Sequence, residues 1–248
     1  MKQIIFIITG SWFIISVMGC KPDPPIKTEV STMDITINHF FGSNDFRLDE
    51  EYTLPSNEQV KFSRYSYLLS DFYLIDENDF RIALNNQYLY ADIRSSKKNL
   101  TLTDIPKGPY TGIGFSIGLD SIINHGNPNQ YNSDHPLSPI NNSLHWSWQG
   151  GYIFAAIEGK TLANNESFIF HLAGAQNKVD FELPYNFSKG DDAIHAILNY
   201  NIEEVFQNPE LYTIEIDGSS THNVEDSVTL KLFNNMKDVF SVSSIESL

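Results

Sequence analysis

The chain has 248 residues, of which 31 are Asp or Glu and 16 are Lys or Arg, so its formal net charge at pH 7 is −15. This acidity argues against a nucleic-acid or anionic-membrane surface, because both need clustered basic side chains. The single cysteine, Cys20, excludes a disulfide framework and a thiolate metal cluster. Any metal site must therefore use imidazole, carboxylate, thioether or carbonyl ligands.

Residues 1–20 have the pattern of a lipoprotein signal. Lys2 precedes a long apolar run that ends in V-M-G-C, which places a small residue before the expected cleavage point. Cys20 stands where a bacterial lipobox places its lipidated residue; the alternative is a short membrane anchor with an incidental cysteine. Residues 21–30 contain three closely spaced prolines, typical of an extended tether. We expect a bacterial cell-envelope protein, held at the outer membrane through its lipid on the periplasmic or surface side.

The body of the chain, residues 31–242, is predicted to be a single domain built from short strands. Residues 33–39 alternate between apolar and polar side chains, and His39 ends the apolar face of this first strand. Further strand patterns occupy 60–69, 72–75, 80–93, 110–120, 152–157, 166–172, 179–185 and 212–216, between turns rich in Gly, Pro and Asn. The glycines at 112, 114 and 118 alternate with apolar residues, which indicates close packing of neighbouring backbone.

One segment near the C-terminus has helical periodicity. Residues 226–240 carry apolar side chains at i, i+1, i+4, i+7 and i+8 from Leu232, and Asp226 is placed to cap this helix. Residues 193–200 fit either a strand or a short helix, and residues 202–206 fit one or two helical turns. Many short strands with one clear helix predict an all-β, immunoglobulin-like or Greek-key β-sandwich with a long polar loop and a short C-terminal helix.

The long polar loop covers residues 121–142 and contains three prolines and six asparagines. A loop of this length in a compact domain is usually functional or disordered. It leads directly into L-H-W-S-W-Q-G-G-Y-I-F at 144–154, which holds Trp146 and Trp148, the two tryptophans left once the signal is removed. On a strand both rings share one face, either as a core anchor or as part of a site. The glycine pair 150–151 predicts a bulge.

The histidines are the strongest candidates for chemistry. There are seven of them: His39, His125, His135, His145, His171, His195 and His222. A lone buried histidine is usually a hydrogen-bonded core residue. Several histidines on different strands, without a thiolate, are instead compatible with a copper site or a similar imidazole site. The acidic runs at 49–51, 191–192 and 203–204 fit a solvated surface, so we expect no catalytic residues and no enzyme activity.

Several motifs together resemble the MbnP-like family of exported bacterial proteins, which are often lipoproteins of Bacteroidetes. The most specific is H-W-S-W-Q-G-G-Y-I-F at 145–154. It is accompanied by N-H-F-F-G at 38–42, Y-L-L-S-D-F-Y-L at 67–74, G-L-D-S at 118–121, H-P-L at 135–137 and F-x-F-H-L at 168–172. The resemblance extends over residues 32–240, nearly the whole predicted mature chain.

The resemblance implies copper binding in the periplasm or at the cell surface. The family is linked to methanobactin, a copper-chelating peptide, and to an MbnH-type dihaem c-type cytochrome or peroxidase that oxidises a tryptophan of the binding protein to kynurenine. At the matching positions, Trp146 or Trp148 is the candidate modified residue. His39 and His171 are the leading candidate ligands, followed by His135 and His222. The chain departs from the family pattern at His145, where an apolar residue is expected.

Two other functions are compatible with the residues. A cell-surface module that binds glycans or proteins without a metal would present Trp146, Tyr131 and Tyr152 as an exposed row of rings. A hydrolase would use carboxylates near the loop at 121–142, at a separation that the sequence does not give.

Overall fold

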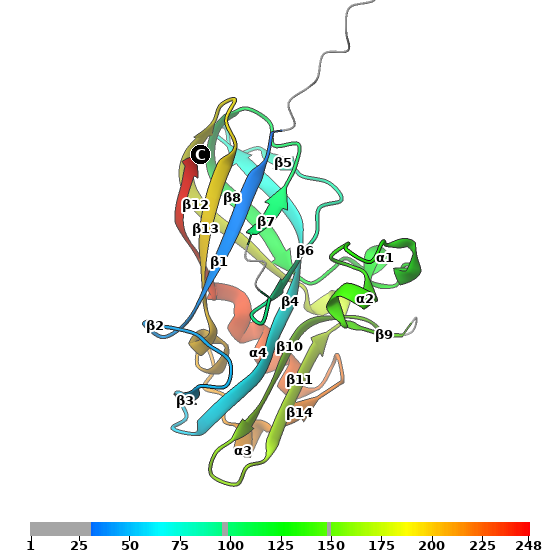
Figure 1. The fold of residues 1–248 in the computed structure, drawn as a ribbon. Coiled ribbons are helices and arrows are strands. Elements are labelled where there is room, and N and C mark those ends of the chain that lie inside the picture. Colours follow the sequence, from blue (N-terminus) through cyan, green and yellow to red (C-terminus); the bar gives the residue numbers. More distant parts are fainter. Residues whose placement is uncertain (1–30, 96–98, 148–149) are drawn as a thin grey trace, which may run out of the picture.

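The fold is described for residues 31–95, 99–147 and 150–248 of a computed structural model (Figure 1). The predicted signal with Cys20, the tether and Trp148 lie outside these described residues. Among the described helices, none combines the length and the apolar character needed to cross a bilayer.

The described strands form two sheets that pack against each other, which confirms the expected all-β sandwich. The smaller sheet has the order β15 (Phe240–Ser247), β13 (Ile194–Asn201), β1 (Met33–Phe41) and β2 (Asn44–Asp45), with β7 (Asn99–Leu102) also paired to β1. The larger sheet has the order β12 (Val179–Lys189), β8 (Gly108–Ile117), β4 (Gln59–Asp76), β10 (Gly151–Thr161), β11 (Ser167–Ala173) and β14 (Ser220–Thr221). Short strands extend it: β3 (Glu51–Thr53), β5 (Arg81–Ala83) and β6 (Leu89–Asp92) pair with β4, and β9 (His145–Ser147) pairs with β10.

Strand β4 is the spine of the larger sheet. The sequence indicated a break at residues 70–71, but the strand continues through a bulge. Asp71 has φ 54°, and the register with β8 shifts between Ser70 and Tyr73. Lys178 forms an ion pair with the Asp71 carboxylate, which fixes the bulged residue. The uninterrupted strand carries Arg64 and Ser66 on one face and two tyrosines on the other.

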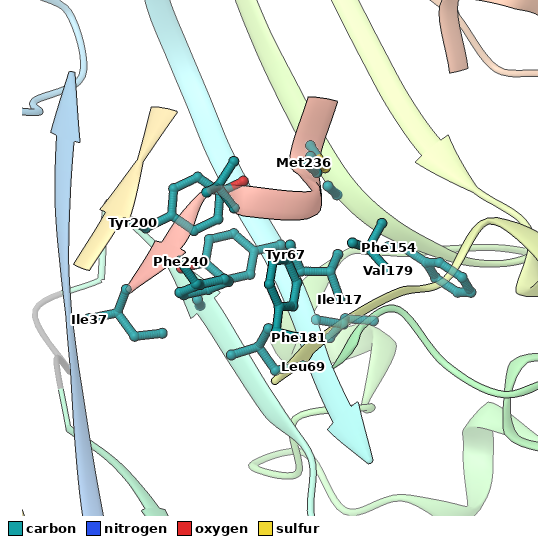
Figure 2. Packing of buried hydrophobic residues seen from close by; sticks show 14 of the residues in the cluster. Ile37, Tyr67, Leu69, Ile117, Phe154, Val179, Phe181, Tyr200, Met236 and Phe240 are labelled. Atoms are coloured by element: carbon teal, nitrogen blue, oxygen red, sulfur yellow. The ribbon is translucent and has the colours of Figure 1, made fainter. Parts of the chain in front are cut away.

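Aromatic rings fill the space between the sheets (Figure 2). Tyr65 and Tyr67 of β4 are fully buried, and the Tyr65 hydroxyl lies 2.8 Å from the Tyr200 hydroxyl of β13. Phe240 packs edge-on against Tyr200 with a centroid distance of 4.8 Å and against Tyr67 at 6.1 Å. Because buried phenols need hydrogen-bond partners, these contacts fix both the separation and the register of the two sheets.

The predicted polar loop is an ordered projection, which we call the side arm (residues 119–144). It contains α1 (Ser121–Asn124), η1 (Pro128–Gln130) and α2 (Pro139–Asn142), and Figure 1 shows α1 and α2 beside β9 at one side of the sandwich. Asp120 caps α1 by accepting hydrogen bonds from the backbone of Ile122 and Ile123. Asn127 caps η1 in the same way, by accepting a hydrogen bond from the Asn129 amide at 2.9 Å.

The C-terminal segment differs from the prediction. Helix α4 (Ser227–Asn235) begins at the expected Asp226 cap, which accepts from the Thr229 amide at 2.8 Å. The helix ends earlier than predicted, in η4 (Met236–Asp238), and residues 240–247 form β15 instead. Because β15 pairs with β13 as far as Ser247, the predicted domain end at residue 242 is too early. The remaining helical turns are η2 (Ala175–Asn177), η3 (Ile202–Phe206) and α3 (Ile214–Asp217).

Candidate metal centre

Two strands bring His171 and His222 side by side. β14 runs parallel to β11, with Phe170 in register with Thr221, so the next residue on each segment is a histidine. The centroids of the two imidazoles are 4.9 Å apart, with their planes at 75°. His171 is half-buried and His222 is exposed, so the His171 ring faces the protein and the His222 ring faces solvent.

Strand β9 adds Trp146 to the histidine pair. The register of β9 and β10 shifts between Gly151 and Tyr152, and Gly151 has φ 68°, so the predicted bulge is present. The half-buried indole of Trp146 lies 6.2 Å from His222 and 6.4 Å from His171, measured between ring centroids. One of the two candidate tryptophans therefore meets two of the four candidate ligands.

The two nitrogens of His171 have different surroundings. Nε2 lies 3.0 Å from Glu158 Oε1, and the same oxygen accepts from Arg64 Nη1 at 3.1 Å. Burial alone raises the pKa of Glu158, but the hydrogen bonds from His171 and Arg64 outweigh it and hold the pKa below its ordinary value. An ionised carboxylate only accepts, so Nε2 carries a proton, and in the neutral imidazole Nδ1 then has the lone pair. Within the described residues, the buried Nδ1 has no hydrogen-bond partner.

This donor set fits copper. His171 and His222 offer imidazole nitrogens, and the described residues contain no group of three or more His, Cys, Asp or Glu that could hold a metal ion. Structural zinc sites use four protein ligands, and calcium and magnesium sites use oxygen ligands. Imidazole is a ligand for copper, zinc, iron and nickel, so two imidazoles are compatible with a copper ion.

An open cleft of about 600 Å³ borders His222 and Trp146. Trp146 and His222 line it together with Asn124 and His125 of the side arm, and residues 174–176 and 223–224 complete the wall. His125, which the sequence placed only in a polar loop, therefore lies at the rim of the same site. The cleft gives solvent access to His222 and to the indole.

His39, predicted as a leading ligand, does not belong to this centre. Its Nε2 lies 2.8 Å from the Tyr67 hydroxyl, and its ring packs against Tyr200 at 5.7 Å. Tyr67 pairs with Ala155, whereas Ala156 pairs with both Ser66 and His171. Paired residues share a face and consecutive residues alternate, so His39 and His171 lie on opposite faces of the larger sheet.

His135, another predicted ligand, has its closest contacts within the side arm. Its Nδ1 accepts a hydrogen bond from the Leu137 amide at 3.0 Å, and its ring stacks on Tyr131 at 4.3 Å. Tyr152 is fully buried, and its hydroxyl donates to the Leu137 carbonyl. Trp146, Tyr131 and Tyr152 therefore do not form the exposed row of rings that a glycan-binding face would present.

One further motif in the chain has a purely structural environment. Residues 114–118 read G-F-S-I-G, the spacing of the nucleophile turn in α/β hydrolases. Ser116 lies within strand β8, is buried, and donates to Asp180 Oδ1 at 2.7 Å. A nucleophile turn instead exposes its serine between a strand and a helix.

Sequence reasoning missed Glu158 and Arg64, the two charged residues behind His171. A signal was present for Glu158, which is the first charged residue after an apolar run in G-Y-I-F-A-A-I-E. A carboxylate at the end of such a strand is half-buried and needs a partner. Arg64 had no comparable signal, because its pairing with Glu158 depends on the register of β4 and β10.

His145 gives a prediction for acid stability. Its ring packs edge-on against Tyr152 at 4.7 Å, its buried Nε2 has no hydrogen-bond partner among the described residues, and burial lowers its pKa. Protonation therefore favours the unfolded chain, and stability falls as pH drops below the unfolded value of about 6.5. We expect His145→Phe to lose less stability than the wild type between pH 7.5 and 5, measured by urea unfolding. Equal losses in both proteins would contradict this role.

Comparison with known protein families gives a match. The sequence model of the MbnP family matches residues 30–227, which is most of the chain and includes Trp146, His171 and His222. The chain belongs to the MbnP family. A search of the curated proteins finds no match.

A solved member of the MbnP family supports the fold. The structure of MbnP from Methylosinus trichosporium has a TM-score of 0.56 to this chain at 14% identity, over 88% of this chain and 99% of that one. At this identity the likeness extends to the fold alone. The family match ends inside α4, so β15, which completes the smaller sheet, lies beyond the matched region of this MbnP-family chain.

Proposed function

We propose that this MbnP-family chain is a lipid-anchored copper-binding protein of the bacterial cell envelope, and not an enzyme. The observation that supports this most is the convergence of the His171, His222 and Trp146 rings beside an open cleft that His222 and Trp146 line, with His171 Nδ1 unpartnered among the described residues. The lipid on Cys20 and the proline-rich tether would hold the domain at the outer membrane. The net charge of −15 attracts cations to the surface.

In the proposed site His171 and His222 hold the copper ion, which supplies a redox-active centre when bound. Glu158 keeps the proton on His171 Nε2, so that Nδ1 remains a donor. The exposed His222 is the first ligand that an arriving ion meets. The Trp146 indole lies beside both imidazoles, with ring centroids 6.4 Å from His171 and 6.2 Å from His222.

Trp146 is the candidate for conversion to kynurenine by a dihaem partner, with Trp148 as the second candidate. The supporting feature is its position on the cleft wall, where a partner reaches the indole. With two equivalents of peroxide as the oxidant, and the partner's haems supplying the redox chemistry, the C2–C3 bond of the indole would be cleaved. N-formylkynurenine and two water molecules result, and hydrolysis then releases formate and leaves kynurenine.

Metal analysis of the purified chain tests this proposal. We expect about one copper per chain after incubation with Cu(I) and removal of weakly bound metal, since the two imidazoles form one site. Adding an MbnH-type partner and peroxide is expected to change the mass of the peptide that contains Trp146 and Trp148. Failure of the wild-type chain to retain copper would refute the metal function and favour a binding module without a metal.

A further inference from the structure

Among the described residues, Arg64 is the only side chain that hydrogen-bonds both to Glu158, the partner of His171, and to the side arm, which leads into the strand of Trp146. Its Nη1 donates to Glu158 Oε1 at 3.1 Å, and its Nη2 lies 3.4 Å from the backbone oxygen of Asn142. Its Nε donates to Ser66 Oγ at 3.1 Å, which holds the guanidinium plane against β4. The side chain is 17% exposed, so these contacts are shielded from bulk water.

Asn142 connects this guanidinium to Trp146. It is buried at the end of α2, where its Nδ2 donates to the Pro136 carbonyl at 2.6 Å and its Oδ1 accepts from the Leu144 amide at 2.7 Å. The Leu144 carbonyl in turn accepts from the Ile153 amide of β10 at 2.7 Å. The side arm is therefore fastened to the sheet just before β9 begins at His145.

We propose that Arg64 is the positioning residue of the metal centre: one guanidinium orients His171 through Glu158 and sets Trp146 through the Asn142 carbonyl. This inference rests on the proposed copper function for its purpose, but the positioning itself concerns the metal-free chain. Only arginine suits the position, because its planar fork donates in three directions while it stays charged. Lysine can pair with Glu158 as a point charge and cannot maintain all three contacts.

The two parts of the site, the histidine pair and Trp146, lie on different strands and need a common contact to keep their relative position. Glu158 and His171 lie on β10 and β11, which pair over most of their length, whereas Trp146 lies on β9, which pairs with β10 through Ser147 and His145 alone. A contact that orients a ligand imidazole typically contributes 10–100-fold to metal affinity. A shift of the side arm moves the indole relative to the histidines, so one arginine couples the two halves of the site.

Variants that remove the contact with His171 or the contact with Asn142 separately test this proposal. Glu158→Ala removes the acceptor for His171 Nε2–H, whereas Glu158→Gln retains a neutral acceptor. Arg64→Lys retains a charge beside Glu158 and removes the contact with Asn142. Arg81→Lys is the matched control, because Arg81 forms an exposed ion pair with Glu182 elsewhere on the same sheet.

The first measurement uses the metal-free protein. ¹⁵N NMR of the histidine rings is expected to show the Nε2–H tautomer of His171 in the wild type and in Glu158→Gln, and a tautomer mixture in Glu158→Ala. ¹⁹F NMR of fluorotryptophan-labelled protein, assigned with Trp148→Phe, is expected to show a shifted Trp146 signal in Arg64→Lys. Both signatures are expected to stay unchanged in Arg81→Lys.

The second measurement is Cu(I) affinity by competition with a chromophoric chelator. We expect about 10–100-fold weaker binding in Glu158→Ala and in Arg64→Lys, and partial recovery in Glu158→Gln. Unchanged His171 and Trp146 signatures in both variants would refute the positioning role, even if the wild type binds copper. If the NMR signatures change in the variants but the wild-type protein binds no copper, the positioning role is supported and the proposed copper function is refuted.

Discussion

His171→Ala is expected to abolish tight copper binding, whereas His39→Ala is expected to preserve it and to destabilise the fold. Removing His171 leaves one imidazole beside Trp146, and we expect a loss of at least about 100-fold in Cu(I) affinity, because even groups that only support a ligand contribute 10–100-fold. His222→Ala is expected to have a similar effect, since the two rings lie 4.9 Å apart.

His39→Ala acts on a different part of the molecule. It removes the partner of the Tyr67 hydroxyl, which is fully buried between the sheets. An unpaired buried phenol costs about 1–3 kcal/mol in free energy of unfolding. Chelator competition and urea unfolding on the same three variants distinguish the two roles. Loss of copper in His39→Ala with unchanged stability would contradict the assignment of His39 to the core.

This reversal between His39 and His171 shows where sequence reasoning stops. Both residues lie in alternating strand patterns beside aromatic residues, so their local sequences are equivalent. Their separation depends on the pairing of Ala155 with Tyr67 and of Ala156 with His171. A shift of one residue in either register moves a side chain to the other face of the sheet. Alternation gives the face of a strand, and only the register shows which faces meet.

The fold was predictable where the pattern was long and local. The strands at 33–39 and 110–120 and the cap at Asp226 follow directly from alternation and capping chemistry. Strand β14 has two residues, too few for any period, yet it carries the register that brings His222 to His171. Strand β15 was hidden because Val239 and Phe240 continue the helical spacing, and Phe240 is buried in either conformation.

Gly118→Ala, directly after the end of β8, is expected to cause a large loss of stability. Gly118 has φ 110°, a conformation that alanine rarely adopts, and a Cβ there would lie 2.4 Å from Phe154 Cδ2. Phe154 is fully buried on β10, and the Gly118 backbone is held by the Leu68 carbonyl at 3.0 Å and by the Ser70 hydroxyl at 2.7 Å. Strain and overpacking together are expected to cost ~2–4 kcal/mol.

The matched control for Gly118→Ala is Gly190→Ala. An added Cβ at Gly190 has nothing within 4 Å, so we expect a change of less than about 1 kcal/mol in urea unfolding. Gly118 directly precedes the side arm, and Phe154 lies on β10, the strand that pairs with β9. The same substitution is therefore expected to displace Trp146 and to weaken copper binding. Equal unfolding midpoints for the two variants would mean that the Phe154 side chain moves to accommodate the added methyl group at little cost in stability. The packing of Gly118 against Phe154 would then not be what anchors the side arm to the sandwich.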